Sequence, residues 1–307
     1  MNGEFVPVDR GMISVRTHGF AYGTGCFEGI RGYWNDADQQ IYIFRLREHF
    51  ERLLDSCKIL QIALPYTVEQ LIEISLELVR RNGQQQDVYL RPVAYKAETT
   101  IGVRLHGLKD NFIITSEPMG NYVDITGLRC GVSSWRRIDD NAIPARAKIS
   151  GSYVNSALAK SEAMQNGFDE AIMLTHDGHV SEGSAENIFL VMNGELVTPA
   201  PTENILLGIT RDTVIELARR ELGRITRERQ IDRTELYIAD EIFLCGTGAQ
   251  IAPVVSVDHR PVGDGQVGPI AGILQPLYFE VVRGFKPEYR AQWCTPVYAR
   301  VPQHTES

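Results

Sequence analysis

The sequence predicts an α+β protein of two domains, and three observations lead to this prediction. The chain has 307 residues, which at roughly 100–200 residues per domain corresponds to about two domains, each with its own core. Short β-like runs and stretches of helical periodicity follow one another in both halves of the chain. Hydrophobic residues make up 43% of the sequence and charged residues 23%, as in soluble globular proteins, which excludes extensive disorder.

The first 101 residues combine β-like runs with two helices. Residues 47–60 carry Phe50 and Leu53 at helical spacing, and residues 67–82 repeat that pattern before Gly83 supplies a stop signal. The β-like runs cover residues 5–8, 40–44 and 88–93. This half of the chain therefore predicts a small α+β domain.

A polar stretch separates this half from the second. Strand-like runs at residues 111–115 and 128–134 precede residues 136–144, whose composition is that of a linker. We therefore expect a small domain over residues 1–133, a linker over 134–144 and a large domain over 145–307.

The second half alternates helices, strands and tight turns. Asp177-Gly178 and Asn193-Gly194 are strong hairpin signals, and Thr210 can cap a helix that ends at Gly223. The other expected helices cover residues 154–166 and 268–282, and the expected strands cover residues 170–175, 188–192, 196–198 and 241–245, with a loop at 246–248.

Charge and cysteine content exclude several classes of protein. The formal net charge is −8, so no basic surplus exists to bind nucleic acid or an anionic membrane. The five cysteines are odd in number and form no C-x-x-C pair, which favours reduced thiols in the cytosol. The amino terminus lacks the pattern of a secretory signal, and no run approaches about 18 apolar residues. We expect a cytoplasmic protein without membrane or nucleic-acid partners.

Common motifs of cofactor binding and hydrolysis are missing. No G-x-G-x-x-G directly joins an expected strand to an expected helix, no P-loop occurs, and the seven histidines have no metal-ligand spacing, so no metal is expected. G-x-S-x-G is also absent, which argues against serine hydrolysis.

One lysine stands among small residues, in the segment Ala145-Arg-Ala-Lys148-Ile-Ser-Gly-Ser152. Small neighbours leave space around the amine, and a desolvated lysine has a lowered pKa that suits formation of an imine. A solvated surface lysine is the alternative, and composition alone favours it.

Two further stretches are candidates for chemistry. Residues 181–189 set two carboxylates, a glycine and an amide before a strand, although a polar turn is the simpler explanation of this stretch taken alone. Residues 206–212 form a glycine-containing loop that runs into a helix, where free N–H groups and the helix dipole suit an anion such as a phosphate.

Together these stretches resemble the signature of the class IV aminotransferases. The matching strings are Glu182-x-Ser184-x-x-Asn187-Ile188-Phe189, Leu196-x-Thr198 and Leu206-x-Gly208-Ile209-x-Arg211. Four other strings resemble the branched-chain amino-acid aminotransferases in particular: His18-Gly-Phe-Ala-Tyr22-Gly-Thr-Gly-Cys-Phe27-Glu-Gly29-Ile-Arg31, Arg47-Glu-His49-x-x-Arg52-Leu, Tyr89-x-Arg91-Pro92 and Ser133-Ser-Trp135. The resemblance extends over about residues 1–273.

The resemblance implies an enzyme of fold type IV that uses pyridoxal 5′-phosphate. Such enzymes have a small α/β amino-terminal domain and a larger pseudobarrel domain, with the cofactor between them. By this resemblance Lys148 binds the cofactor covalently and moves a proton during catalysis, which requires a primary amine. Glu182 faces the pyridine nitrogen and keeps the ring protonated, and Tyr153 binds the 3′-oxygen.

The resemblance also assigns the cofactor's phosphate and ring face. Arg52, the residues Ile209 and Thr210 at the helix start, and Thr247 bind the phosphate, which agrees with the donors that a guanidinium and a helix N-terminus offer. Leu206 packs against one face of the ring.

The expected substrate pocket combines aromatic groups, glycines and one arginine. The residues at the family's pocket positions are Tyr22, Phe27, Gly29, Tyr89, Arg91, Val103, Trp135, Thr247 and Gly248. The aromatic groups and Gly29 shape an apolar hole for a branched side chain, while N–H groups at Thr247 and Gly248 hold the α-carboxylate. Arg91 lets the same pocket accept the second carboxylate of glutamate. Val103 reaches the neighbouring subunit's site, which implies a homodimer or a higher homo-oligomer.

The chain departs from the family at several positions. Gly248 stands where many relatives have alanine, Gln250 where many have glutamate, and Leu207 where a proline is common. Residues 98–101 differ from the glycine-rich loop of bacterial relatives, which leaves the side-chain preference open.

The function that the resemblance implies is a ping-pong transamination. An L-branched-chain amino acid (Leu, Ile or Val) donates its amino group and leaves as a 2-oxo acid, and 2-oxoglutarate then accepts that group and leaves as glutamate. Alternatives with the same fold are an R-selective amine or D-amino-acid transaminase and an aminodeoxychorismate lyase. The strings around Tyr89-x-Arg91 and Phe27-Glu-Gly-Ile-Arg31 favour the branched-chain enzymes.

Overall fold

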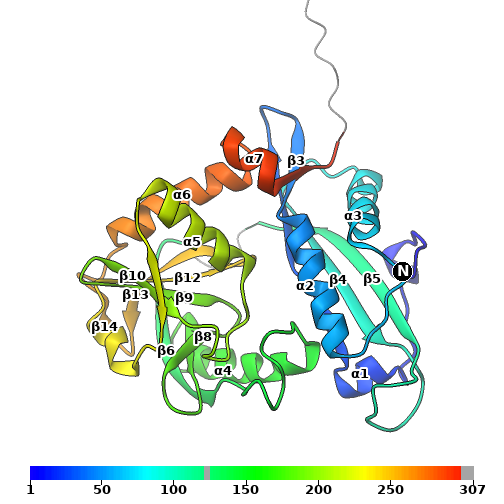
Figure 1. The fold of residues 1–307 in the computed structure, drawn as a ribbon, viewed down its shortest axis with the longest axis horizontal. Coiled ribbons are helices and arrows are strands. Elements are labelled where there is room, and N and C mark those ends of the chain that lie inside the picture. The colour runs from blue at the N-terminus through cyan, green and yellow to red at the C-terminus, as the bar shows by residue number, and fades with distance from the viewer. Residues whose placement is uncertain (121–124, 299–307) are drawn as a thin grey trace, which may run out of the picture.

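The computed structural model describes residues 1–120 and 125–298 and has two lobes that lie side by side (Figure 1). Each lobe is built on its own β-sheet, and helices pack on both sheets. The predicted α+β class is confirmed. None of the helices in the described ranges is long and apolar enough to cross a membrane.

The small lobe contains a six-stranded sheet in which every neighbouring pair is antiparallel. Its order is β1 (Gly25–Phe27), β4 (Val88–Lys96), β2 (Ile30–Asn35), β3 (Gln40–Phe44) and β15 (Cys294–Pro296), and β5 (Asp110–Pro118) pairs with β4. The amino-terminal segment adds η1 (Val8–Arg10) and α1 (His18–Tyr22).

Two helices, α2 (Leu46–Ile59) and α3 (Val68–Asn82), bury their apolar faces in the core of this lobe. Phe50 and Leu53 of α2 are fully buried there, as their spacing predicts. Thr67 and Gln70 form a capping box at the start of α3, and Gly83 ends it in the left-handed conformation with φ of 60°. The sequence therefore specifies both ends of this helix locally.

The large lobe contains a nine-stranded mixed sheet. Its order is β11 (Thr226–Arg229), β10 (Glu195–Pro199), β9 (Asn187–Met192), β12 (Glu241–Gly246), β13 (Gln250–Val257), β6 (Leu128–Arg136), β7 (Glu170–Leu174) and β8 (Val180–Gly183), and β14 (Arg260–Pro261) pairs with β13. The pairs β10/β11, β13/β6 and β6/β7 are parallel.

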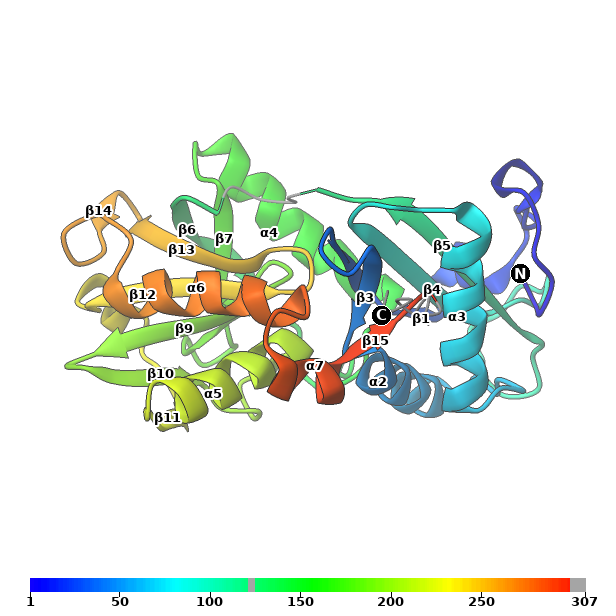
Figure 2. The same cartoon turned by 90° about the horizontal axis from the view of Figure 1, so that it is seen from above.

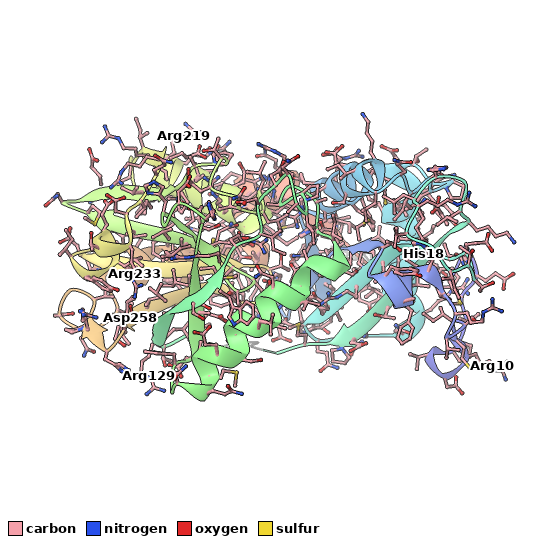
Figure 3. The ribbon with its side chains drawn as sticks, turned by 90° about the horizontal axis from the view of Figure 1, so that it is seen from below. Arg10, His18, Arg129, Arg219, Arg233 and Asp258 are labelled. Atoms are coloured by element: carbon pink, nitrogen blue, oxygen red, sulfur yellow. The ribbon has the colours of Figure 1, made fainter. Side chains whose placement is uncertain are left out.

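Helices cover this sheet in two places. The helix α4 (Tyr153–Gln165) follows the short η2 (Ser150–Ser152) and packs on β6 and β7, while α5 (Ile209–Glu221) and α6 (Pro269–Val282) pack on β12. Figure 2 shows α6 leading into α7 (Pro287–Trp293) and then β15, so the carboxyl-terminal part returns to the small lobe. A short helix, η3 (Arg233–Tyr237), precedes β12. Figure 3 shows Arg129, Arg219 and Arg233 on the outer surface of the large lobe.

The strand pairing differs from the domain boundary expected at residues 134–144. The strand β6 spans Leu128–Arg136 and pairs with β7 and β13, so the chain has already entered the large lobe before residue 134. Likewise, β15 pairs with β3 of the small lobe, although it falls within the range 145–307. Pairing between strands that are far apart in the sequence determines to which lobe β6 and β15 belong, and local composition does not indicate that pairing. Residues 299–307 of that range lie outside the described residues.

Among the expected elements, the strand at residues 5–8 is not formed, because Pro7 removes a backbone donor and η1 begins at Val8. Thr210, the expected cap of α5, lies inside the helix, whose N-cap is Gly208, two residues earlier. The strands that were not expected from the sequence are β1, β2, β8, β11, β13, β14 and β15. The remaining expected helices and strands are confirmed to within a few residues at their ends.

The core of the large lobe yields a stability prediction. Leu244 of β12 is fully buried between Ile188 and Ala252 of the neighbouring strands, whereas Ile225 is 85% exposed. Leu244→Ala should lower the free energy of unfolding by about 2–5 kcal/mol, because it removes buried methyl groups and leaves a cavity. Ile225→Ala, the matched control, should change it by less than about 0.5 kcal/mol. Urea unfolding followed by circular dichroism measures both, and equal effects would contradict this account of the core.

Candidate active site

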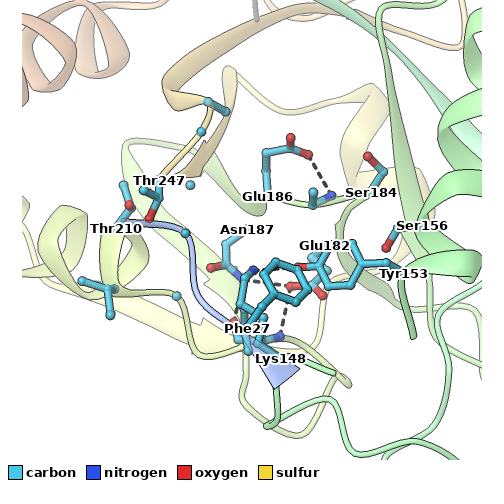
Figure 4. Close-up of a pocket in the computed structure, with 18 of the residues that line it drawn as sticks. Phe27, Lys148, Tyr153, Ser156, Glu182, Ser184, Glu186, Asn187, Thr210 and Thr247 are labelled. Carbon is cyan, nitrogen blue, oxygen red and sulfur yellow. Dashed lines mark hydrogen bonds between the residues drawn. The ribbon is translucent and has the colours of Figure 1, made fainter. Parts of the chain in front are cut away.

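A cavity of about 450 Å³ opens where the two lobes meet. The small lobe contributes β1, α2 and β4, and the large lobe contributes the segment before α4, the turn from β8 to β9, the loop before α5 and the turn from β12 to β13. Figure 4 shows Lys148, Tyr153, Glu182 and Thr210 around this space. The cavity therefore gathers residues that are more than 200 positions apart in the sequence, from Phe27 to Ala249.

Lys148 lies on an extended segment held by the small lobe. Its backbone N–H donates to Ser56 Oγ of α2 at 3.2 Å, and its carbonyl accepts from the Phe27 N–H of β1 at 3.0 Å. The side chain enters the cavity, where Nζ lies 2.6 Å from the Tyr153 hydroxyl and 5.1 Å from the centre of the Phe27 ring. A backbone fixed on both sides leaves only the side chain of Lys148 free to move.

Glu182 presents a buried carboxylate from β8. One oxygen lies 2.9 Å from Nη2 of Arg137, and the other accepts from the Asn187 side chain at 3.0 Å and from the Leu206 N–H at 3.1 Å. Burial raises the pKa of Glu182, and Arg137 opposes that shift. The carboxylate is thereby fixed in place and suited to accept a hydrogen bond from a protonated ring nitrogen.

The start of α5 forms a cup for an anion. The first N–H groups of this helix belong to Ile209 and Thr210, both buried at the cavity wall, and these positions have no acceptor within the helix. Arg52 and Thr247 line the same cavity, and Nη1 of Arg52 donates to the Leu207 carbonyl just before the helix. Helix N–H groups and a guanidinium together suit a phosphate.

Another part of the cavity wall combines aromatic rings with a second arginine. The Arg91 guanidinium lies 4.5 Å from the centre of the Phe27 ring and 5.0 Å from that of Tyr89. A Cβ at Gly29 would overlap the Tyr89 hydroxyl, so only glycine fits beside this ring. Gly248 also lines the cavity. This side can hold an apolar chain and a carboxylate.

Two of the expected pocket residues lie outside this chain's own cavity. Tyr22 of α1 is 39% exposed and its hydroxyl accepts from the Gly102 N–H at 3.1 Å, while Val103 is 77% exposed. These contacts keep Tyr22 beside the segment that carries Val103, on the surface of the small lobe.

Trp135 also differs from its expected place in the pocket. It stands near the end of β6, its side chain is 43% exposed, and it does not line the cavity. Met119, which lies just beyond β5, lines the cavity instead. The short string Ser133-Ser-Trp135 gave no information about which way the strand side chains face.

The chain matches the family model described as "Amino-transferase class IV" over residues 25–257. The chain belongs to the class IV aminotransferases. It is 49% identical over 297 residues to a probable branched-chain-amino-acid aminotransferase from Aquifex aeolicus (strain VF5), an alignment that covers 96% of this chain and 95% of that protein.

Solved structures of this family resemble the whole chain. A branched-chain aminotransferase from Thermoproteus uzoniensis, determined with norvaline, has a TM-score of 0.93 and 44% identity and covers 97% of this chain and 98% of that one. The branched-chain amino acid aminotransferase from Thermobaculum terrenum, in its holo form with pyridoxal 5′-phosphate, has a TM-score of 0.92 and 40% identity over 97% of each chain. The expected fold type IV is confirmed.

Pyridoxal 5′-phosphate is the cofactor of the class IV aminotransferases, and the cavity fits it. A primary amine, a phenol and a buried carboxylate lie along one side, where Lys148, Tyr153 and Glu182 meet, and the cup at α5 suits the phosphate. Leu206 lines the wall between the carboxylate and the cup, so it can pack on the ring.

Sequence reasoning missed several cavity groups. Arg137 was expected in the linker, because a short polar stretch does not reveal that its guanidinium reaches the Glu182 carboxylate. Asn187 belongs to the family signature, but its spacing alone did not indicate that it holds Glu182 and the Leu206 carbonyl together. Ser184 and Glu186 of the same turn also line the cavity.

The close packing at Gly208 yields a prediction for cofactor binding. A Cβ at this position would overlap Asn187 Oδ1, and Asn187 cannot shift without losing its bonds to Glu182 and the Leu206 carbonyl. Gly208→Ala should therefore weaken binding of pyridoxal 5′-phosphate by about tenfold or more. Absorbance titration of the cofactor-free protein measures this. Gly272→Ala in α6, where an added Cβ meets no atom within 4 Å, is the control and should leave the affinity unchanged.

Proposed function

We propose that this class IV aminotransferase transfers the amino group between L-branched-chain amino acids and 2-oxoglutarate in a ping-pong cycle. The carrying observation is the side of the cavity where Arg91 lies over the Phe27 and Tyr89 rings, because it offers apolar surface and one cation in the same space. An apolar side chain and the second carboxylate of glutamate can each be accepted there. Relatives with this name align over nearly the full chain, which supports the proposal.

The proposed chemistry divides between the cofactor and three side chains. Pyridoxal 5′-phosphate supplies an electron sink for the amino acid's Cα. Lys148 binds the cofactor covalently, is displaced by the incoming amine and then moves the proton at Cα as base and acid. The Tyr153 hydroxyl, 2.6 Å from Nζ, orients that amine and binds the ring's 3′-oxygen.

Glu182 and the phosphate cup hold the ring in position. Glu182 keeps the ring nitrogen protonated, and its contacts with Arg137 and Asn187 prevent it from turning away. The phosphate is bound by Arg52, Ile209, Thr210 and Thr247, and Leu206 packs on the ring. The cofactor would be held at its phosphate by the cup and at its ring nitrogen by the Glu182 carboxylate. This places its reactive carbon beside Lys148.

The substrate's α-carboxylate is assigned to the turn between β12 and β13. Thr247 and Gly248 follow β12 and line the cavity, so their N–H groups can serve as its donors. Phe27, Gly29 and Tyr89 surround the side chain of the substrate.

We further propose that the protein forms a homodimer, or a higher homo-oligomer, in the cytoplasm. Tyr22 and Val103 remain exposed at the surface of the small lobe, together with Phe20 at 70% and Ile101 at 90% exposure. A patch of this kind favours a protein interface. In a second copy it would supply the pocket residues that this chain's own cavity lacks.

A substrate panel tests the proposed function. Purified protein with bound cofactor should form glutamate from L-leucine and 2-oxoglutarate, and rates with D-alanine or R-1-phenylethylamine should be at least about tenfold lower. Lys148→Ala should lower the leucine rate about 10³-fold or more, whereas Lys58→Ala, an exposed lysine of α2, should leave it unchanged. Faster turnover of the D-amino acid or the R-amine, or release of pyruvate from aminodeoxychorismate without an acceptor, would overturn the proposal.

The role assigned to Arg91 predicts a selective change in KM. Arg91→Met retains apolar volume and removes the cation, so the KM for 2-oxoglutarate should rise about tenfold or more while the KM for L-leucine changes less than about threefold. Steady-state kinetics with each substrate varied in turn measures both values. Arg219→Met, on the exposed face of α5, should change neither. An equal rise in both KM values would show that Arg91 only shapes the pocket.

A further inference from the structure

Glu28 is a buried carboxylate next to the cavity that the proposed function does not use. It lies between β1 and β2, its side chain has no exposed surface, and its backbone N–H donates to the Pro92 carbonyl of β4. An ionised carboxylate in such a place requires close partners, because burial without them is costly. Those partners come from one face of α2.

Arg52 occupies both oxygens of this carboxylate. Its Nε donates to Oε1 at 2.7 Å and its Nη2 donates to Oε2 at 2.8 Å, which is the paired geometry that matches a guanidinium to a carboxylate. The remaining nitrogen, Nη1, points to the large lobe and donates to the Leu207 carbonyl at 2.8 Å. Glu28 thus determines which edge of Arg52 faces the cup at α5.

His49 completes the cluster from three residues before Arg52 on α2. Its Nδ1 lies 2.8 Å from Glu28 Oε2, so that nitrogen is the donor. Burial lowers the pKa of His49, although Glu28 opposes that shift, and a neutral ring with its proton on Nδ1 satisfies the bond. Burial alone would raise the pKa of Glu28, but Arg52 and His49 outweigh it and hold the pKa well below its usual range.

We propose that Glu28, supported by His49, is a positioning residue that orients Arg52 toward the cofactor's phosphate. This inference rests on the proposed function, in which Arg52 binds that phosphate. The long arginine side chain has many rotamers, and the two bonds to Glu28 select one of them before the phosphate arrives. Through Arg52 and the Leu207 carbonyl, the same two bonds also position the loop before α5.

Orientation and charge act in opposite directions here, which makes the proposal testable. Glu28 neutralises Arg52, so its removal raises the positive charge near the phosphate. Its removal also frees the guanidinium, because Glu28→Gln replaces one acceptor with an amide donor that faces an N–H of Arg52. The direction of the Arg52 N–H donors matters more for phosphate binding than the added positive charge, because the donors act at hydrogen-bond distance and solvent in the cavity screens the charge. Loss of Glu28 should therefore weaken phosphate binding.

The experiment compares two ligands that differ only by the phosphate. Cofactor-free protein is titrated with pyridoxal 5′-phosphate and with pyridoxal, and the ratio of the two Kd values measures the contribution of the phosphate. Arg52→Gln and Glu28→Gln should each lower this preference about tenfold to 100-fold, the range of a charge-assisted hydrogen bond. The preference of the double variant for the phosphate should lie within about threefold of that of Arg52→Gln, because both changes remove the same interaction.

A matched control separates positioning from general stability. Asp110→Asn breaks the ion pair with the buried Lys96 in the same lobe, and neither residue lines the cavity. This variant should melt at a lower temperature and keep the parent's preference for the phosphate. If Glu28→Gln does not fold, His49→Gln retains the carboxylate, removes its third bond and should lower the preference about threefold.

The outcomes distinguish the inference from the function beneath it. Equal weakening of both ligands by Glu28→Gln, or a stronger preference for the phosphate, overturns the positioning role. If only His49→Gln folds, an unchanged preference in that variant overturns it. An unchanged preference in Arg52→Gln overturns the assignment of Arg52 to the phosphate and with it this part of the proposed function.

Discussion

The hydrogen bonds between the small lobe and the segment that carries Lys148 are the constraint on which the rest of the site depends. The N–H of Phe27 and the hydroxyl of Ser56 hold the backbone of Lys148 on both sides, while the segment itself belongs to the large lobe. Arg52 adds a third link, through the Leu207 carbonyl. Phe44 of the small lobe packs edge-on against Tyr278 of α6, so the contact between the lobes includes residues of the large lobe's hydrophobic core. These contacts fix the two lobes to each other. The distance from the Lys148 amine of the large lobe to Arg52 and Arg91 of the small lobe therefore stays constant.

The sequence predicted the elements whose ends are specified locally. The helix α3 has its capping box at Thr67 and its left-handed Gly83, and the hairpin turns contain Asp-Gly and Asn-Gly. The strands β1 and β2 escaped notice because they are short and almost wholly buried, so that their side chains show no alternation of polar and apolar residues. The strand pairing does not follow the expected domain boundary, because the pairing of β6 with β13 involves residues that are more than 100 positions apart.

For the site, most residues that the resemblance names line the cavity, whereas the groups that support them through space could not be found from local sequence. Glu182 was expected from a matched string and Lys148 from its small neighbours and the family resemblance, and both line the cavity. Arg137 and Glu28 act through other side chains, and nothing in their local sequence indicates the partner. Trp135 stood in a matched string, but its side chain is 43% exposed and does not line the cavity. A motif thus identifies the chemistry better than it identifies the residues that support it.

The charge of the cavity follows from how its acids are compensated. The net charge of the chain is −8, but Glu28 is offset by Arg52 and Glu182 by Arg137. Burial and the nearby Glu170 raise the pKa of Glu186 to about 8, so this acid is mostly protonated at neutral pH. None of these acids then offsets the positive charge of Arg91, of Lys148 or of the N-terminal end of the α5 dipole. The cavity can therefore attract a phosphate and two substrate carboxylates within an acidic protein. Above pH 8 the ionised Glu186, which also lines the cavity, would oppose that attraction.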